Sequence, residues 1–367
     1  MVRYLRIGLT LALWFLVASV AQARTITDAA GRQVEVPDQV SRVICSGAGS
    51  LRLLVYLGAQ GLAVAVDDIE TRRSDFDARP YALAHPELKD LPVFGEFRGH
   101  DNPERILALE PKPQVIFKSV ATLGYEPAEL QSKTGIPVVV VDPGDIGRRQ
   151  APFFASLRLM AGVIGAQARA EEVISFFEHH IKMLEDKTRD ITDQQRPAVY
   201  LGGVAFRGPH GFRSTEPGYP PFAFVGARNL ADGPTAASGP ARQAEVAKEQ
   251  IVAWNPAILF LDLSTLQLGE DAGGLHELKR DPAYRSLDAV KNGKVFCLLP
   301  YNWYAANHCS ILANAYYVGA LLYPDRFRDI NPVTIADEIY TFLVGAPVFA
   351  RMNSAFHGLA FQPAPLR

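Results

Sequence analysis

The stretch "ERILALEP", Glu104–Pro111, occurs in similar form a second time as "EQIVAWNP" at Glu249–Pro256. In both copies a glutamate opens a short amphipathic segment and a proline ends it, which is typical of a helix. An apolar run typical of a buried strand follows each copy, "VIF" at Val115–Phe117 and "ILF" at Ile258–Phe260. The same helix and strand in both halves of the chain predict two lobes of similar construction.

Short apolar segments alternate with helical segments in both halves of the chain. The strand-like segments are Arg42–Gly47, Leu62–Asp68, Gln114–Lys118, Ile136–Asp142, Ala198–Gly203, Ala257–Leu263 and Lys294–Pro300. Buried strands separated by helices predict parallel sheets that are covered by helices on both faces. We therefore expect an α/β protein with two Rossmann-like lobes.

A long helical region without strand signals separates the two halves, from Pro152 to about Gln194. Its second part, Ala168–Arg189, carries apolar residues on one face and charges on the other. At 1.5 Å per residue this part would be roughly 30 Å long, which is enough to join two lobes across a ligand cleft. The predicted divisions are a signal peptide at 1–23, an N-terminal lobe at 24–150, a helical linker at 151–195 and a C-terminal lobe at 196–367.

The first 23 residues have the pattern of a secretory signal peptide. Arg3 and Arg6 precede the apolar stretch Ile7–Val20, and Ala21-Gln22-Ala23 fits a small-x-small cleavage site. The apolar stretch is short for a bilayer span, which weighs against the alternative of an uncleaved membrane anchor. We predict an exported, soluble protein that is cleaved after Ala23.

Composition and motifs argue against several classes of function. The formal net charge of −2 over 367 residues is near balance and no basic stripe is evident, so nucleic acid is not an expected partner. The sequence contains no G-x-S-x-G elbow, no Walker A loop and no metal-ligand cysteine pair. We therefore expect a binding protein without a cofactor rather than an enzyme.

Three cysteines, Cys45, Cys297 and Cys309, form an odd and sparse set. A protein of this size does not need disulfides to fold. We favour buried free thiols, and a Cys297–Cys309 bridge remains the alternative.

The segments that follow the predicted strands are rich in arginine, aromatic residues and histidine. In parallel α/β sheets ligands lie beyond the carboxyl ends of the strands, and two lobes would bring these segments together across a cleft. The candidate ligand-binding residues are Ser46, Arg98, Arg207, His210, Arg213, Trp303, Tyr304 and His308. Aromatic rings and guanidinium groups suit a bulky, partly anionic ligand such as a metal chelate.

Several of these candidates have a structural alternative. "SGAGS", Ser46–Ser50, could cradle an anion on its backbone N–H groups, but an ordinary tight turn is the simpler interpretation. His210 lies between a proline and a glycine, a setting that also fits an exposed loop residue. His308 begins a predicted helix and could equally be a cap-region or core residue.

The whole pattern resembles the periplasmic substrate-binding proteins of ABC importers, and in particular the branch that handles ferric siderophores, haem and cobalamin. The resemblance covers roughly Thr25–Phe342. Its most specific motifs are "NPERILALEPKPQVIF" at Asn102–Phe117 and "KEQIVAWNPAILF" at Lys248–Phe260. Supporting matches are "DAAGRQVEVP" at Asp28–Pro37, "TGIPVVVVD" at Thr134–Asp142 and "SLDAVKNGKVFCLLP" at Ser286–Pro300.

The resemblance implies that Glu104 and Glu249 dock onto arginines of the permease. A glutamate in the first turn of a helix is also a good helix starter, and two copies at matched positions favour docking. By position, Trp303 and Tyr304 match the aromatic loop that follows the last sheet strand in the family. The Arg207–Arg213 segment matches the loop after the first strand of the second lobe.

The function that this resemblance implies is capture of an iron complex, in first place a ferric siderophore, in the periplasm. The bound protein would deliver the complex to an ABC importer permease and its ATPase, and we expect a monomer. Cobalamin, haem or a directly ligated metal ion or oxyanion are alternative ligands for the same fold. A periplasmic metal-handling enzyme and a sensor-type binding module remain alternatives from other classes.

Overall fold

The computed structural model describes residues 23–72, 75–120, 123–232 and 243–366, so the predicted signal segment lies outside it except for Ala23. Ala23 is the first residue of β1 (Ala23–Thr27), which pairs with β2 (Gln33–Pro37) in an antiparallel hairpin. None of the described helices alone is long and apolar enough to cross a membrane. One pair of helices, bent by 108°, passes that test by length and composition only.

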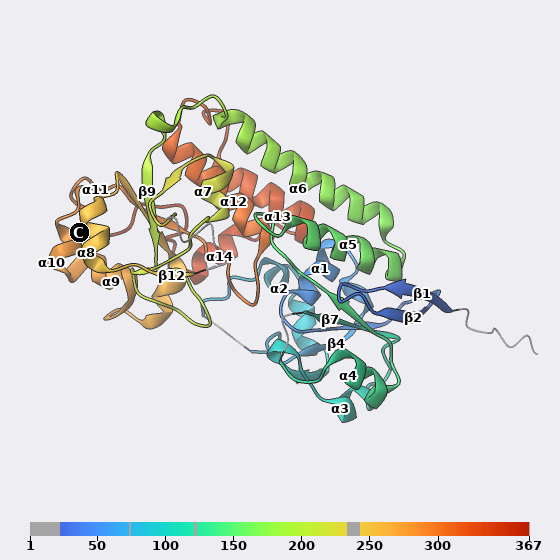
Figure 1. The fold of residues 1–367 in the computed structure, drawn as a ribbon. Helices are drawn as coiled ribbons and strands as arrows, with labels where there is room; N and C mark the ends of the chain where they lie inside the picture. The colour runs from blue at the N-terminus through green and yellow to red at the C-terminus, as the bar shows by residue number, and fades with distance from the viewer. Residues whose placement is uncertain (1–22, 73–74, 121–122, 233–242, 367) are drawn as a thin grey trace, which may run out of the picture.

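Two separate main sheets confirm the α/β fold class (Figure 1). The N-terminal sheet has the order β6-β5-β4-β3-β7-β8, and every pair except β5/β6 is parallel. Its strands are β3 (Val43–Ser46), β4 (Ala63–Asp67), β5 (Val93–Glu96), β6 (His100–Asp101), β7 (Val115–Ser119) and β8 (Val138–Val141). The C-terminal sheet has the order β11-β9-β13-β14 and is parallel throughout. Its strands are β9 (Ala198–Gly202), β11 (Arg228–Asn229), β13 (Ile258–Asp262) and β14 (Val295–Leu298).

Helices cover these sheets because successive apolar side chains of a strand point to opposite faces, so both faces are apolar and must be buried. The helices of the first half are α1 (Ser50–Tyr56), α2 (Pro80–Ala84), α3 (Pro103–Leu107), α4 (Pro127–Thr134) and α5 (Gln150–Ile164). On one face of the N-terminal sheet Ile44 and Ile116 pack with Ile106 of α3 and Leu130 of α4, all fully buried. Burial of each such side chain stabilises the fold by about 2 kcal/mol.

The helices of the second half are α7 (Pro220–Phe224), α8 (Lys248–Trp254), α9 (Gly273–Arg280), α10 (Pro282–Arg285), α11 (Asp288–Lys291), α12 (His308–Leu322), α13 (Pro332–Val344) and α14 (Phe349–Ala355). The repeated motif of the sequence is therefore a helix followed by a strand, α3 and β7 in one half and α8 and β13 in the other. Two further short strands, β10 (Ser214–Thr215) and β12 (Ala244–Glu245), form an antiparallel pair.

The long linking helix is α6 (Gln167–Thr188), whose 22 residues give it a length of about 33 Å. It runs over both halves of the molecule, with α12 and α13 beneath it (Figure 1). α13 also contacts α1 and α2 of the N-terminal half. The lobes are therefore held together by packed helices as well as by the linking helix. The exact lobe boundaries remain predictions.

All three cysteines are free and buried, as favoured from the sequence over a Cys297–Cys309 bridge. Burial raises the pKa of the Cys45 thiol and of the Cys297 thiol to about 12. Thiols of this kind remain protonated at neutral pH and behave as small apolar side chains.

Candidate functional site

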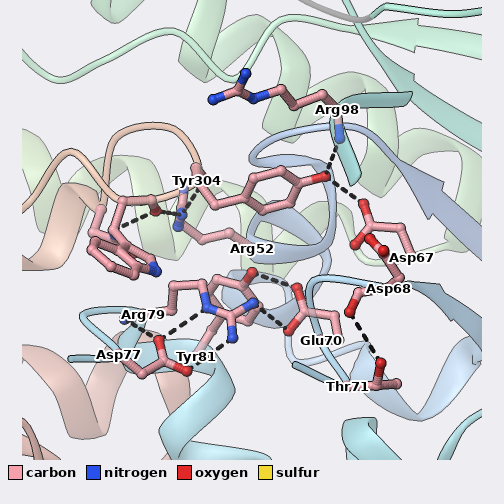
Figure 2. A network of polar contacts seen from close by, with 12 residues as sticks. Arg52, Asp67, Asp68, Glu70, Thr71, Asp77, Arg79, Tyr81, Arg98 and Tyr304 are labelled. Carbon is pink, nitrogen blue, oxygen red and sulfur yellow. Dashed lines mark hydrogen bonds and ion pairs between the residues drawn. The ribbon is translucent and has the colours of Figure 1, made fainter. Parts of the chain in front are cut away.

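The turn Tyr301–Ala306, which follows β14 of the C-terminal sheet, lies against the N-terminal lobe (Figure 2). Arg52 of α1 donates hydrogen bonds to the carbonyl oxygens of Ala306 at 2.7 Å and Tyr304 at 2.8 Å. A longer bond of 3.3 Å reaches the carbonyl of Trp303. Arg52 is only 1% exposed, so these bonds form in the interior between the lobes.

Tyr304 continues this contact with its side chain. Its hydroxyl donates a short hydrogen bond to the carboxylate of Asp67 at the end of β4, and it accepts one of 3.0 Å from the backbone N–H of Arg98. The guanidinium of Arg98 points away from Asp67 (Figure 2). The tyrosine hydroxyl thus has two partners in the opposite lobe, which limits its capacity to bind a ligand directly.

A buried ionic cluster lies beside the same turn. Arg79 binds Glu70 at 3.0 Å and Asp77 at 2.8 Å, and the hydroxyl of Tyr81 donates to Glu70 at 2.6 Å (Figure 2). Burial raises the pKa of Glu70, whereas the positive charge of Arg79 acts in the opposite direction. Because each buried charge has a partner, the cluster is a rigid part of the N-terminal lobe beside Tyr304.

The buried carboxyl of Asp67 predicts that the stability of the protein depends on pH. Burial raises the pKa of its carboxyl to about 7, although the Tyr304 hydrogen bond and the Arg79 charge lower it; Glu70 and Asp68 raise it further. The folded protein therefore holds this proton more tightly than the unfolded chain, whose Asp pKa is about 3.9. The corresponding stabilisation is complete below pH 3.9 and is lost as the pH rises through 7. Relative to Asp67→Asn, which does not titrate, wild type should lose thermal stability between pH 4 and 7. A pH-independent difference in Tm would contradict this.

Two arginines with left-handed backbone follow strands of different lobes. Arg98 (φ 64°) comes after β5 and Arg207 (φ 56°) after β9. Each guanidinium lies over the ring of the preceding phenylalanine, at 5.2 Å from the Phe97 centroid and 5.4 Å from the Phe206 centroid. Both arginines are exposed. Strained backbone of this kind concentrates at functional sites.

The turn Tyr301–Ala306 contacts the segments that carry both arginines. Tyr304 accepts the bond from Arg98 N–H, and the Asn302 side chain donates a 2.8 Å bond to the carbonyl of Ala205, two residues before Arg207. The Arg98 and Arg207 segments therefore both contact this one turn, at positions two residues apart.

A cavity lies between the lobes on another side of the turn. Its lining residues are Asp145, Arg148, Arg149, Glu216, Pro217, Gly218, Pro220, Tyr301, Asn302 and Ala306. Arg149 is paired with Asp142, and the hydroxyl of Tyr301 donates a short hydrogen bond to Glu216. Arg148 and Arg149 share this lining with the carboxylates of Asp145 and Glu216, and neither Arg98 nor Arg207 belongs to it.

The other residues expected in the site differ in how far they are exposed. Trp303 is half-buried against the core. His210 is half-exposed, with Nε2 2.8 Å from the carbonyl oxygen of Phe206. Arg213 is exposed and donates a 3.1 Å bond to the carbonyl of Val246.

Ser46 and His308 have no exposed surface. The His308 ring stacks on Phe153 with 4.1 Å between centroids, and its Nε2 lies 3.1 Å from the carbonyl oxygen of Pro143. This is the core position that was the alternative for His308, and it corrects the expectation of a ligand contact. Ser46 is also buried, at the end of β3, and its expected contact with the ligand is corrected in the same way.

Sequence reasoning did not select Arg52, Asp67 or Asn302 as candidate residues, although Asp67 and Asn302 lie in segments that follow predicted strands and were expected to face the cleft. A signal for Arg52 was present, because it is the single charge in the apolar helix sequence "SLRLLVY". A buried arginine requires several acceptors, so a lone arginine in such a helix indicates a buried contact.

Two α/β lobes joined by a long helix, with a cavity between them, are the architecture of a substrate-binding protein. The sequence profile of the family described as "Periplasmic binding protein" matches residues 43–301, more than half of the chain, and the chain belongs to this family. The family resemblance inferred from the repeated motif is thereby confirmed. Relatives in it are substrate-binding proteins of ABC transporters and not enzymes. Family membership implies a periplasmic location, while cleavage after Ala23 remains a prediction.

Individual relatives differ in what they bind. The molybdate-binding protein MolA of Haemophilus influenzae is 23% identical over 342 residues, covering 86% of this chain and 90% of MolA. The structure of MolA bound to molybdate superimposes with a TM-score of 0.66 at 21% identity and covers 88% of this chain and 98% of MolA. A periplasmic solute-binding protein of Veillonella parvula gives a TM-score of 0.68 at 17% identity, covering 91% and 97% of the two chains. The periplasmic haem-binding protein HutB of Vibrio cholerae gives 0.56 at 20% identity, covering 77% and 99%.

Proposed function

We propose that this periplasmic binding protein captures a bulky anionic metal chelate, in first place a ferric siderophore, and delivers it to the permease of an ABC importer. The observation that carries the proposal is the pair of exposed, left-handed arginines, Arg98 and Arg207, one from each lobe. Guanidinium groups bind anionic oxygen atoms in bidentate geometry. Their positions at the ends of β5 and β9 are those where α/β folds bind ligands.

Exposed apolar side chains support a ligand that is larger than an inorganic ion. Six large apolar side chains are exposed among the described residues, and four of them belong to segments that follow strands. These four are Val120, Leu123, Phe206 and Leu268. Apolar side chains beside arginines suit a ligand with a charged, oxygen-rich centre and an organic periphery.

A small oxyanion is the second candidate, and a separate observation favours it. The cavity beside Arg148 and Arg149 has two arginines and no exposed aromatic side chain in its lining. A relative of this chain, MolA, is named a molybdate-binding protein. If the ligand is an oxyanion, Arg148 and Arg149 would bind it, and Arg98 and Arg207 would have no role in binding.

Glu104 and Glu249 complete the proposal as the contacts to the permease. Each is exposed in the first turn of its helix, α3 or α8, and Figure 1 places these helices at opposite ends of the molecule. The side chain of Asn102 accepts a 2.9 Å bond from the N–H of Arg105 and so fixes the first turn of α3. Two negative charges on separate lobes would set the register of docking on basic residues of a partner.

Calorimetric titration tests the ligand class. The probes are ferric triscatecholate, which is anionic, neutral ferric trihydroxamate, haem, cobalamin and molybdate. We expect the anionic ferric complex to bind with a Kd of about 1 μM or less and at least about tenfold more tightly than the neutral one, since both arginines are positively charged. Binding of molybdate without any chelate would favour the oxyanion candidate, and no binding by any probe would contradict both.

A further inference from the structure

The side chain of Arg52 belongs to one lobe and its acceptors to the other. It lies in α1, where its neighbours Leu51, Leu53 and Leu54 are buried apolar residues of the N-terminal lobe. Its guanidinium reaches the carbonyl oxygens of the turn Tyr301–Ala306. The two ends of the shortest bond are separated by 254 residues in the chain.

The turn has a backbone that needs such support. Tyr304 (φ 48°) and Ala305 (φ 66°) are both left-handed, although neither is glycine. Two consecutive residues in this conformation each cost roughly 1 kcal/mol or more, so the surroundings must hold them there. Arg52 supplies three donor contacts, and Asn307 donates to the carbonyls of Tyr301 and Trp303 at 3.0 Å each.

These bonds hold the backbone of the turn and leave its side chains to contact the cleft segments. With the carbonyls held by Arg52, the Asn302 amide reaches Ala205 and the Tyr304 hydroxyl reaches Asp67 and Arg98 N–H. The guanidinium suits this role because its planar fork donates to several acceptors at once, whereas a lysine ammonium is a compact point charge.

We propose that Arg52 is a positioning residue that fixes the Tyr301–Ala306 turn from the opposite lobe and so preforms the ligand cleft. It acts through the turn and does not itself contact the ligand. The consequence for affinity rests on the proposed function, but the position of the turn does not.

The test uses Trp303 as a reporter in the absence of ligand. The chain has three tryptophans, so Trp14→Phe and Trp254→Phe leave Trp303 as the sole tryptophan of the full-length protein, which can be excited selectively over the tyrosines. In this background Arg52→Lys should shift the emission of Trp303 to longer wavelength and increase its quenching by acrylamide by about twofold or more, because the released turn exposes the indole.

Arg169→Lys is the matched control. Arg169 also donates to two backbone carbonyls, those of Tyr56 and Phe342, and its guanidinium stacks on the Phe342 ring at 4.3 Å. Its loss should lower Tm as the loss of Arg52 does but leave Trp303 emission unchanged. Unchanged emission in Arg52→Lys, or an equal change in Arg169→Lys, would overturn the positioning role.

Ligand binding distinguishes a failure of this inference from a failure of the proposed function. If the turn is ordered in only a tenth of Arg52→Lys molecules, affinity for the ferric triscatecholate should fall about tenfold. A Trp303 shift with no chelate bound by wild type would leave the role of Arg52 supported and contradict the proposed ligand. A Trp303 shift with unchanged chelate affinity would overturn the claim that the turn preforms the cleft.

Discussion

Replacing both Glu104 and Glu249 with alanine is expected to abolish uptake while ligand affinity stays as in the wild type. Both side chains are exposed, and neither lines the cavity between the lobes. Their removal therefore leaves the cleft intact and removes one negative contact from each lobe. Losing one partner of an interfacial charge pair weakens association by about 30-fold or more, so losing both should reduce docking to background. Uptake of the labelled ligand by cells that carry the variant measures the effect.

A second double variant controls for the loss of surface charge in general. Glu35 lies on β2 and Glu338 on α13, and both are exposed. Glu35→Ala with Glu338→Ala changes the net charge by the same amount and should leave uptake unchanged. Each single variant, Glu104→Ala or Glu249→Ala, should retain partial uptake because one lobe still docks. Normal uptake in the Glu104/Glu249 double variant would remove the docking proposal without affecting the ligand proposal.

The fold could be predicted because its signals are local. The glutamate-to-proline segment Glu104–Pro111 and its copy each begin within a helix, α3 or α8, and are each followed by a strand. The apolar periodicity that predicts these elements spans only a few neighbouring residues. A strand of four or five apolar residues between helices has few alternatives to a buried position in a parallel sheet. The two-lobed arrangement followed from finding this local pattern twice.

The contacts between the lobes could not be predicted in the same way. The bond between Tyr304 and Asp67 joins residues 237 positions apart, and nothing in either local sequence specifies the other. Sequence reasoning placed Tyr304 in the cleft as a ligand contact, whereas its hydroxyl is bonded to the opposite lobe. His308 shows the same difficulty, because a histidine at the start of a helix can face either solvent or core. Here the buried rings of Phe153 and Tyr56 surround it.

Removal of the two cleft arginines should weaken chelate binding by about 100-fold or more. Hydrogen bonds to charged groups contribute about 1.5–3 kcal/mol each, so Arg98→Ala or Arg207→Ala alone should cost about tenfold in affinity. Each arginine makes its own contact with the ligand, so the double variant should lose the contributions of both. Titration with ferric triscatecholate measures the change. Arg105→Ala with Arg285→Ala removes two exposed arginines outside these segments and should leave the Kd unchanged.

The left-handed backbone at both positions also predicts a difference in thermal stability between glycine and alanine variants. Alanine at φ 64° or φ 56° keeps the strain, whereas glycine adopts this conformation without it. The double variant Arg98→Gly with Arg207→Gly should therefore have a higher Tm than the alanine double variant, and both should bind the chelate equally weakly. This combination would indicate that the strained arginines are retained for binding at a cost in stability. If affinity for the chelate is unchanged in both double variants and is lost in Arg148→Ala with Arg149→Ala, the chelate binds in the cavity beside Arg148 and Arg149, and the proposed role of Arg98 and Arg207 is wrong.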